Sequence, residues 1–192
     1  MQKNDNIELE ITDMTADGSG IGRYEGMAVF VPGTAAGDRV IAHILKVKKT
    51  CAYAKLVEVL TPSPDREEPD CDVFSRCGGC VYRHISYAAE CRAKTEKVRA
   101  AVNRIGGIPL EPQPIISAVN TGGYRNKAQY PVGAGGEIGF YAVHSHRIIN
   151  CNACRLQPEI FDKIISACRE WINDYRIAAY DGETHRGLLR HI

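Results

Sequence analysis

The chain is 192 residues long, 44% hydrophobic and 24% charged, with a formal net charge of +1. These values match an ordinary globular protein that forms one large domain or two small ones. No run of about 18 apolar residues is present, which excludes a membrane-spanning helix. The polar, acid-containing start of the chain is unlike a secretory signal. We therefore expect a cytoplasmic protein with no membrane partner.

The first 60 residues consist of short apolar runs separated by glycine-containing turns. The expected strands include residues 7–11, 28–31, 39–44 and 53–59, and the turns fall at residues 17–20, 24–26 and 32–33. Several short strands at close spacing, with no helical periodicity between them, are typical of a small β-barrel. We therefore predict a barrel domain over residues 1–60.

A basic stripe lies near the end of this predicted barrel. No acid occurs between Arg39 and Val57, while the lysines in this interval are Lys46, Lys48, Lys49 and Lys55. Such a cluster suits contacts with the phosphates of a nucleic acid. A solvated strand face would show the same pattern, so the stripe alone leaves both interpretations open.

Residues 61–70 contain three prolines and four acids, which predicts an extended linker and a domain boundary. The following domain, residues 71–192, mixes helices and strands and is predicted to be a small α+β domain. Ser86 and Gly106–Gly107 delimit a helix over residues 87–105, and a second helix begins at Pro158. The expected strands cover residues 115–119, 127–132 and 138–143, with a turn at 133–136.

Cysteines are the unusual feature of the second domain. Because a reducing cytosol disfavours disulfides, clustered cysteines there more often bind metal. Cys71, Cys77 and Cys80 form a C-x5-C-x2-C pattern. Zinc would favour the pair Cys77 and Cys80 with the pair Cys151 and Cys154, whereas an iron–sulfur cluster would favour the triple plus one distant cysteine. Spacing alone leaves these two metals open, beside a third possibility of free buried thiols.

Several motifs together resemble the bacterial 23S ribosomal-RNA uracil-C5 methyltransferase family. They are the segment Cys71–Cys80 followed by His84, the segment Tyr124–Lys127, and Gly139–Tyr141 followed by Cys154–Gln157. The first 60 residues, with residues 17–23 and 29–33, resemble a TRAM domain, which is a small OB-like RNA-binding β-barrel. The likeness covers nearly the whole chain, with the motifs in the family's order.

The resemblance implies a 4Fe–4S cluster, and it decides between the metals in favour of iron. The ligands that it implies are Cys71, Cys77, Cys80 and Cys154, with Cys151 left as a neighbouring thiol. It also implies an RNA partner, ribosomal RNA first, although no protein partner is inferable. The RNA-binding residues are expected to be Lys46, Lys48, Lys49, Arg125 and Lys127.

The same resemblance implies that the parent protein makes 5-methyluridine in RNA. In the family, S-adenosylmethionine, the cysteine nucleophile and the carboxylate base belong to a later Rossmann-like domain. We therefore expect no catalytic residues within residues 1–192 and no activity from this chain alone. The alternatives are a transfer-RNA uracil-C5 methyltransferase and a stand-alone RNA-binding module stabilised by zinc.

Overall fold

The computed structural model describes all residues from Met1 to Ile192, and these form two compact units. The first unit comprises Met1–Pro69 and Val81–Ser117, and the second comprises Asp70–Cys80 and Ala118–Ile192. This division differs from the domains expected from the sequence, because residues 81–117 belong with the first 69 residues. No helix has both the length and the apolar character needed to cross a membrane.

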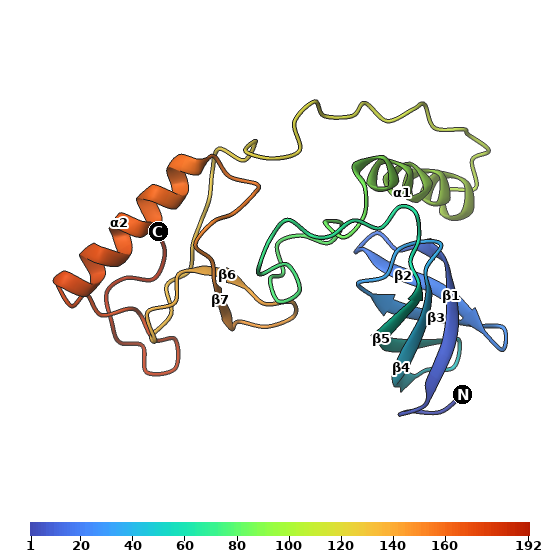
Figure 1. Cartoon of the computed structure of the whole chain (residues 1–192), viewed down its shortest axis with the longest axis horizontal. Coiled ribbons are helices and arrows are strands. Elements are labelled where there is room, and N and C mark those ends of the chain that lie inside the picture. Colours follow the sequence, from blue (N-terminus) through green and yellow to red (C-terminus); the bar gives the residue numbers. More distant parts are fainter. The chain divides into compact units, whose positions relative to one another are not determined.

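The first unit contains a closed five-stranded barrel with the strand order β1-β2-β3-β5-β4 (Figure 1). The strands are β1 (Asn6–Met14), β2 (Ser19–Tyr24), β3 (Met27–Pro32), β4 (Arg39–Val47) and β5 (Cys51–Thr61). Strands β3 and β5 pair in parallel, and all other neighbours are antiparallel. The predicted barrel is confirmed.

The barrel core follows from the alternation of apolar and polar residues along each strand. In β1 the side chains of Ile7, Leu9 and Ile11 are buried, whereas the residues between them are exposed. Successive side chains of a strand point to opposite faces, so one apolar set fills the barrel and the polar set faces solvent. Each fully buried isoleucine, leucine or valine contributes about 1.5–3 kcal/mol relative to exposure.

Strand β2 lies where the sequence predicts mainly turns, because its glycines disguise the strand pattern. A Cβ atom on Gly20 would lie 2.7 Å from Ile11 Cγ2, and one on Gly22 would lie 2.6 Å from Leu9 Cγ. Both distances are far below van der Waals contact, so only glycine lets the β2 backbone approach β1 so closely. The glycines are therefore part of a strand of the barrel.

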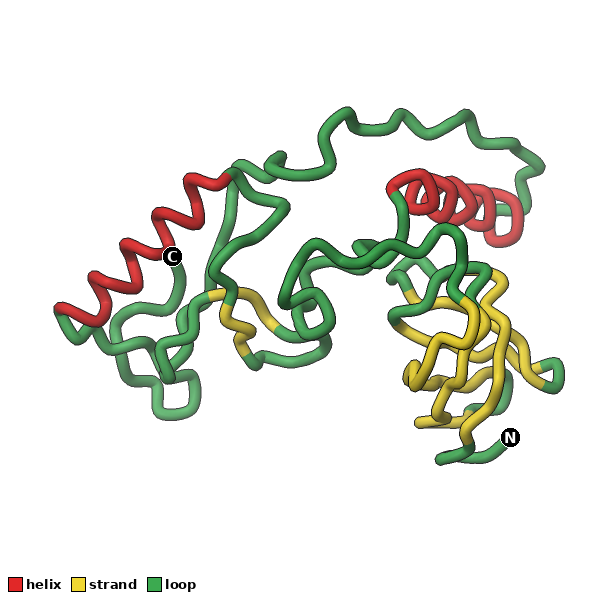
Figure 2. Tube along the Cα trace, viewed as in Figure 1, coloured by secondary structure: helices red, strands yellow, loops and turns green.

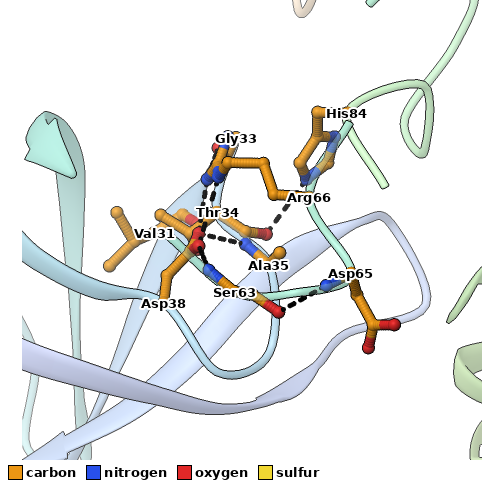
Figure 3. A network of polar contacts seen from close by, with 9 residues as sticks. All are labelled: Val31, Gly33, Thr34, Ala35, Asp38, Ser63, Asp65, Arg66 and His84. Carbon is orange, nitrogen blue, oxygen red and sulfur yellow. Dashed lines mark hydrogen bonds and ion pairs between the residues drawn. The ribbon is translucent and has the colours of Figure 1, made fainter. Parts of the chain in front are cut away.

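Residues 63–67 pack on the barrel and do not form the extended linker expected from the sequence. The backbone N–H of Ser63 donates to Asp38 Oδ1 at 2.8 Å, and that of Glu67 donates to the carbonyl of His84 at 3.0 Å. Arg66 donates to both carboxylate oxygens of Asp38 (Figure 3). The prolines and acids of this segment predict extension, but these polar contacts fix it in place.

Helix α1 (Tyr87–Ala100) continues into a π-helical turn, η1 (Ala101–Ile105), in the first unit. Ser86 Oγ accepts a hydrogen bond from the N–H of Ala89 at 3.2 Å, which confirms the predicted cap. The helical segment ends at Gly106, as expected. Little of α1 is buried: Ala89 is its one buried residue, and Val98 is 50% exposed.

The second unit contains a short hairpin of β6 (Gly139–Tyr141) and β7 (Ile148–Asn150), and helix α2 (Glu159–Asp174) (Figure 1). Its small core joins Tyr130, Val132 and Ile138 to Ile165 of α2. The second helix is confirmed, with Pro158 as its cap residue. The turn at residues 133–136 is also confirmed, since the N–H of Gly136 donates to the carbonyl of Gly133.

The predicted strands of the second domain are the weakest part of the sequence analysis. Residues 106–129 are irregular and are drawn as loop in Figure 2, so the strand predicted at 115–119 is wrong. Ile116 and Val119 are 97% and 98% exposed, so their apolar character reflects no burial in a sheet. The strand predicted at 127–132 is reduced to single bridges at Pro131 and Val132.

Candidate functional site

The loop that carries Cys71, Cys77 and Cys80 lies in the second unit and turns twice within ten residues. The N–H of Cys77 donates to the carbonyl of Val73 at 2.8 Å, which closes a helical turn between the first two cysteines. The N–H of Gly78 then donates to the carbonyl of Tyr141 at 2.9 Å, which attaches the loop to the end of β6. Hydrogen bonds to the hairpin therefore fix the position of the middle cysteine.

The glycine pair between Cys77 and Cys80 is required by this attachment. A Cβ atom on Gly78 would lie 3.0 Å from the carbonyl oxygen of Tyr141, so a larger residue would push the loop away from β6. The N–H of Gly79 donates to Cys77 Sγ at 3.4 Å. Such N–H···S contacts stabilise the thiolate form, which is the form that binds metals.

Cys151 and Cys154 lie in the segment between β7 and α2. The N–H of Cys151 donates to the carbonyl of Ile138 at 3.0 Å, and the N–H of Cys154 faces Asp162 Oδ1 of α2 at 3.4 Å. Arg155 Nε donates to the carbonyl of Asp70 at 2.9 Å. This last bond ties the residue after Cys154 to the residue before Cys71, so two segments distant in sequence meet at the cysteines.

The thiols of the two segments also affect one another's pKa. Burial raises the pKa of Cys77, the hydrogen bond from Gly79 opposes this, and the charges of Cys71 and Cys154 raise the pKa further. Burial raises the pKa of Cys151 to about 12, with further contributions from Cys154, Cys71 and Cys77. The structure therefore brings together thiols from both segments, with Cys80 in the same loop as Cys71 and Cys77.

No three His, Cys, Asp or Glu side chains are arranged as the ligands of one metal ion. The surroundings of the thiols nevertheless suit an inorganic group that accepts hydrogen bonds. The hydroxyl of Tyr130 and the side-chain amide of Gln157 are buried without hydrogen-bond partners. Gln157 is attached to Cys154 through its own N–H, at 3.0 Å from the Cys154 carbonyl.

Tyr130 is also affected electrostatically by the cysteines. Its pKa is raised to about 12, first by burial and then by the charges of Cys154 and Cys151. A buried donor without an acceptor costs about 1–3 kcal/mol. Sulfide and thiolate sulfurs are acceptors for such donors, so the residues present fit an iron–sulfur cluster in ligand type and in the hydrogen-bond donors around them.

The lysines of the basic stripe lie on one region of the barrel. Lys46 is the partner of Tyr53 in the β4–β5 register, and Lys48 and Lys49 form the turn between these strands. All three lysines are exposed. Arg39 differs from them because its Nε lies 2.7 Å from Glu8 Oε1 in an ion pair. The structure therefore groups three exposed cations that were predicted to bind RNA.

Arg125 and Lys127 lie in the second unit and are exposed in an irregular segment. The N–H of Arg125 donates to the carbonyl of Leu156, two residues after Cys154, at 2.9 Å. The predicted RNA-binding residues thus form two groups, one on the barrel and one beside the cysteine segment.

Residues 2–57 match the family model of the TRAM domain. The barrel is a TRAM domain. The match covers the strands from β1 to most of β5, so the three lysines belong to the TRAM barrel.

Longer proteins resemble the chain beyond its TRAM barrel. An uncharacterized RNA methyltransferase of Clostridium tetani is 42% identical over 195 residues, which cover 100% of this chain and 42% of that protein. One from Halalkalibacterium halodurans is 42% identical over 196 residues, which cover 100% of this chain and 43% of that protein. The chain therefore spans less than half the length of these curated relatives.

A solved structure shares the fold of the chain. It is the Pyrococcus abyssi tRNA (uracil-54, C5)-methyltransferase in complex with S-adenosyl-L-homocysteine. The TM-score is 0.68 at 24% identity, and the match covers 95% of this chain and 41% of that one. The fold of this chain therefore also occurs in a solved protein.

Three residues of these sites are missed by the sequence analysis: Tyr53, Tyr130 and Gln157. The sequence does contain a signal for Tyr53, because the inward residues Ala52 and Ala54 flank it in a strand. Gln157 belongs to the motif Cys154–Gln157, but Tyr130 carries no comparable signal, because its position beside the cysteines arises from tertiary packing alone.

Proposed function

We propose that this chain is the RNA-binding and iron–sulfur-binding portion of an S-adenosylmethionine-dependent RNA (uracil-C5)-methyltransferase. The observation that carries the proposal is the 42% identity to RNA methyltransferases along the entire chain. The motifs Cys71–Cys80 and Tyr124–Lys127, which resemble those of uracil-C5 methyltransferases, support uracil C5 as the methylated atom. The fold shared with the Pyrococcus abyssi tRNA enzyme agrees with it.

In this proposal Cys71, Cys77, Cys80 and Cys154 hold a 4Fe–4S cluster. When bound, the cluster supplies iron–thiolate bonds that cross-link the loop 71–80 to the segment after β7. The Tyr130 hydroxyl and Gln157 Nε2 donate hydrogen bonds toward it, which gives these two buried donors an acceptor. Methyl transfer from S-adenosylmethionine to uracil involves no net electron transfer, so the role proposed for the cluster is structural.

The RNA is held by cations of both units. Lys46, Lys48 and Lys49 contact phosphates on the TRAM barrel, and Arg125 and Lys127 contact RNA beside the cysteine segment. The methyl donor, the nucleophile and the base belong to the part of the relatives that this chain does not cover. The domain organisation proposed is a TRAM domain at the start of the first unit, with the cysteines in the second unit, which comprises Asp70–Cys80 and Ala118–Ile192.

The substrate proposed is 23S ribosomal RNA, on the basis of the motif resemblance. Transfer RNA is the second candidate, because the solved relative with the same fold is a tRNA methyltransferase.

Methyl transfer tests this proposal directly. The chain alone, incubated with labelled S-adenosylmethionine and either RNA, is expected to transfer no methyl group to the RNA. In this proposal it binds RNA but lacks the nucleophile and the base. A protein that continues this chain to the length of its relatives is expected to form 5-methyluridine, detected by mass spectrometry of digested ribosomal RNA. Methylation by the chain alone, or a different product from the longer protein, would contradict the proposal.

RNA binding by the lysines is tested by salt dependence. Changing Lys46, Lys48 and Lys49 together to alanine removes three phosphate contacts. Each contact with single-stranded RNA contributes about 0.7 to the slope of log affinity against log salt, so the slope is expected to fall by about 2. Fluorescence anisotropy at several salt concentrations measures it.

The matched control changes three other exposed lysines, Lys3, Lys97 and Lys163, to alanine. It alters the net charge equally and is expected to leave the slope nearly unchanged. An equal fall in both triple variants would mean that only overall charge matters, and the assignment of the barrel lysines would be lost.

A further inference from the structure

The outer surface of the TRAM barrel carries a pair of aromatic rings. Phe30 of β3 and Tyr53 of β5 are partners in the parallel register of these strands. Their ring centroids lie 5.5 Å apart, with 30° between the ring planes. Tyr53 is 39% exposed, and Phe30 is partly exposed. The pair therefore presents aromatic surface to the solvent.

The barrel core does not explain this pair. Val29 and Val31 beside Phe30, and Ala52 beside Tyr53, have no exposed surface and face the interior. The two rings point the other way by the alternation of the strands. Large aromatic side chains on an outward face are available for a ligand.

Cations surround the ring of Tyr53. Lys48 Nζ lies 4.9 Å from the ring centroid, and Lys46 is the cross-strand partner of Tyr53 on β4. Neither lysine forms an ion pair with a carboxylate, and the chain contains no acid between Arg39 and Val57. Aromatic surface and free positive charge therefore occur together at one place on the barrel.

From this juxtaposition we infer that Tyr53 and Phe30 form a stacking site for a base of single-stranded RNA, with Lys46 and Lys48 on the adjoining phosphates. The inference rests on the proposed RNA-binding function and names the feature of RNA that the barrel recognises. A purely phosphate-binding surface needs only the lysines. The rings add affinity for an unpaired base, because the faces of bases in a duplex are already stacked on their neighbours.

The contact of Lys48 with the Tyr53 ring is compatible with base stacking on that ring. The ammonium–ring contact of Lys48 is made by a long, flexible side chain at an exposed position. When a base stacks on the ring, the ammonium group moves to the neighbouring phosphate. The site therefore recognises any unpaired nucleotide, with little selection among the four bases.

The test compares two labelled oligoribonucleotides of about 12 nucleotides, a length in the range that one OB-type barrel binds. One is oligouridylate and the other is an abasic strand with the same phosphates. Tyr53→Leu is expected to weaken binding of oligouridylate by roughly 5- to 100-fold. Binding of the abasic strand is expected to change little, and Tyr53→Phe is expected to retain the affinity of the wild type.

The matched control is Tyr175→Leu, the same change at a tyrosine of the second unit that is 71% exposed. It is expected to leave both affinities unchanged. Stacking is overturned if Tyr53→Leu has no effect, or if it weakens both strands equally. In either case RNA binding by the wild type still stands. Failure of the wild type to bind any RNA defeats the proposed function itself.

Photo-crosslinking of the unaltered protein avoids any folding defect in the variants. A 5-bromouridine-substituted strand is expected to give adducts at Tyr53 or Phe30, located by mass spectrometry of the digested protein. Adducts elsewhere on the barrel, with none at these two rings, would overturn the stacking site.

Discussion

Asp38→Ala is expected to destabilise the first unit by about 3–5 kcal/mol, the usual cost of removing one partner from a buried ion pair. Asp38 has no exposed surface, and its carboxylate accepts from the N–H of Ala35 at 2.7 Å and of Ser63 at 2.8 Å (Figure 3). Arg66 completes the arrangement with two donors. Removing the carboxylate leaves all of these donors without their acceptor.

The effect is measured as the midpoint of denaturant unfolding, with an unchanged slope expected for a two-state transition. Glu8→Ala is the matched control, because Glu8 forms an ion pair with Arg39 in which both side chains are more than half exposed. Exposed pairs contribute about 0–1 kcal/mol. Equal destabilisation by both substitutions would show that the buried network does not hold residues 63–66 on the barrel.

The contribution of Asp38 also depends on pH. Burial acts to raise its pKa, but hydrogen bonds from Arg66, Ala35 and Ser63 and the charge of Arg66 together lower it below 3.8. A lowered carboxyl pKa stabilises the fold above the unfolded value, and this stability is lost as the pH falls through the folded value. The stability difference between wild type and Asp38→Ala is therefore expected to shrink below about pH 4.

His84 adds a second pH dependence to the stability of the first unit. Burial lowers the pKa of His84 from 6.5, so protonation of the unfolded chain reduces stability already below that pH. The charge of Asp38 raises the pKa of His84, so Asp38→Ala is expected to lower that pKa further.

The barrel could be predicted because the sequence patterns that specify its strands and turns each lie within a few neighbouring residues. Alternation in β1 and the glycine-containing turns are visible in a few residues, and Ser86 with Gly106 delimits a helix in the same way. Strand β2 is not predicted, because Gly20 and Gly22 are needed for the close approach of β2 to β1. That need arises from tertiary structure and leaves no strand pattern in the sequence. The prediction of an extended linker at residues 63–67 is wrong for the same reason, since Asp38, the partner of Ser63 and Arg66, lies 25 or more residues earlier in the chain.

The second unit was harder because apolar residues there do not mark burial. Ile116 and Val119 fit a strand pattern but are almost fully exposed. The cysteines were found because their spacing is a local motif, whereas the choice of the fourth ligand rests on resemblance. Tyr130 could not be associated with the cysteines from sequence, because it lies 24 residues before Cys154 and only the fold places it there.

Cys154→Ser is expected to abolish the bound iron, whereas Cys151→Ser is expected to retain it. The protein is prepared anaerobically with iron and sulfide, and iron, sulfide and zinc are then measured per chain. Loss of one thiolate from four leaves an incomplete ligand set, so the effect is nearly all or none. Cys71→Ser is expected to behave like Cys154→Ser, because it removes another proposed ligand.

Cys151 is a poorer ligand for physical reasons. Only 4% of it is exposed, and its Sγ donates to the carbonyl of Ala153 at 3.2 Å, so the thiol is already engaged. Cys168→Ser in α2 is the matched control and is expected to keep the full iron content.

The two metals that the spacing left open predict opposite results. A zinc site built from Cys77, Cys80, Cys151 and Cys154 would tolerate Cys71→Ser and lose its metal in Cys151→Ser. One zinc per chain with that dependence would refute the cluster, while leaving RNA binding by the TRAM barrel intact. Iron and sulfide that depend on Cys71 and Cys154 would make the Cys71–Cys80 loop and the Cys154 segment two halves of one metal site, joined already in the protein by the hydrogen bond from Arg155 to Asp70.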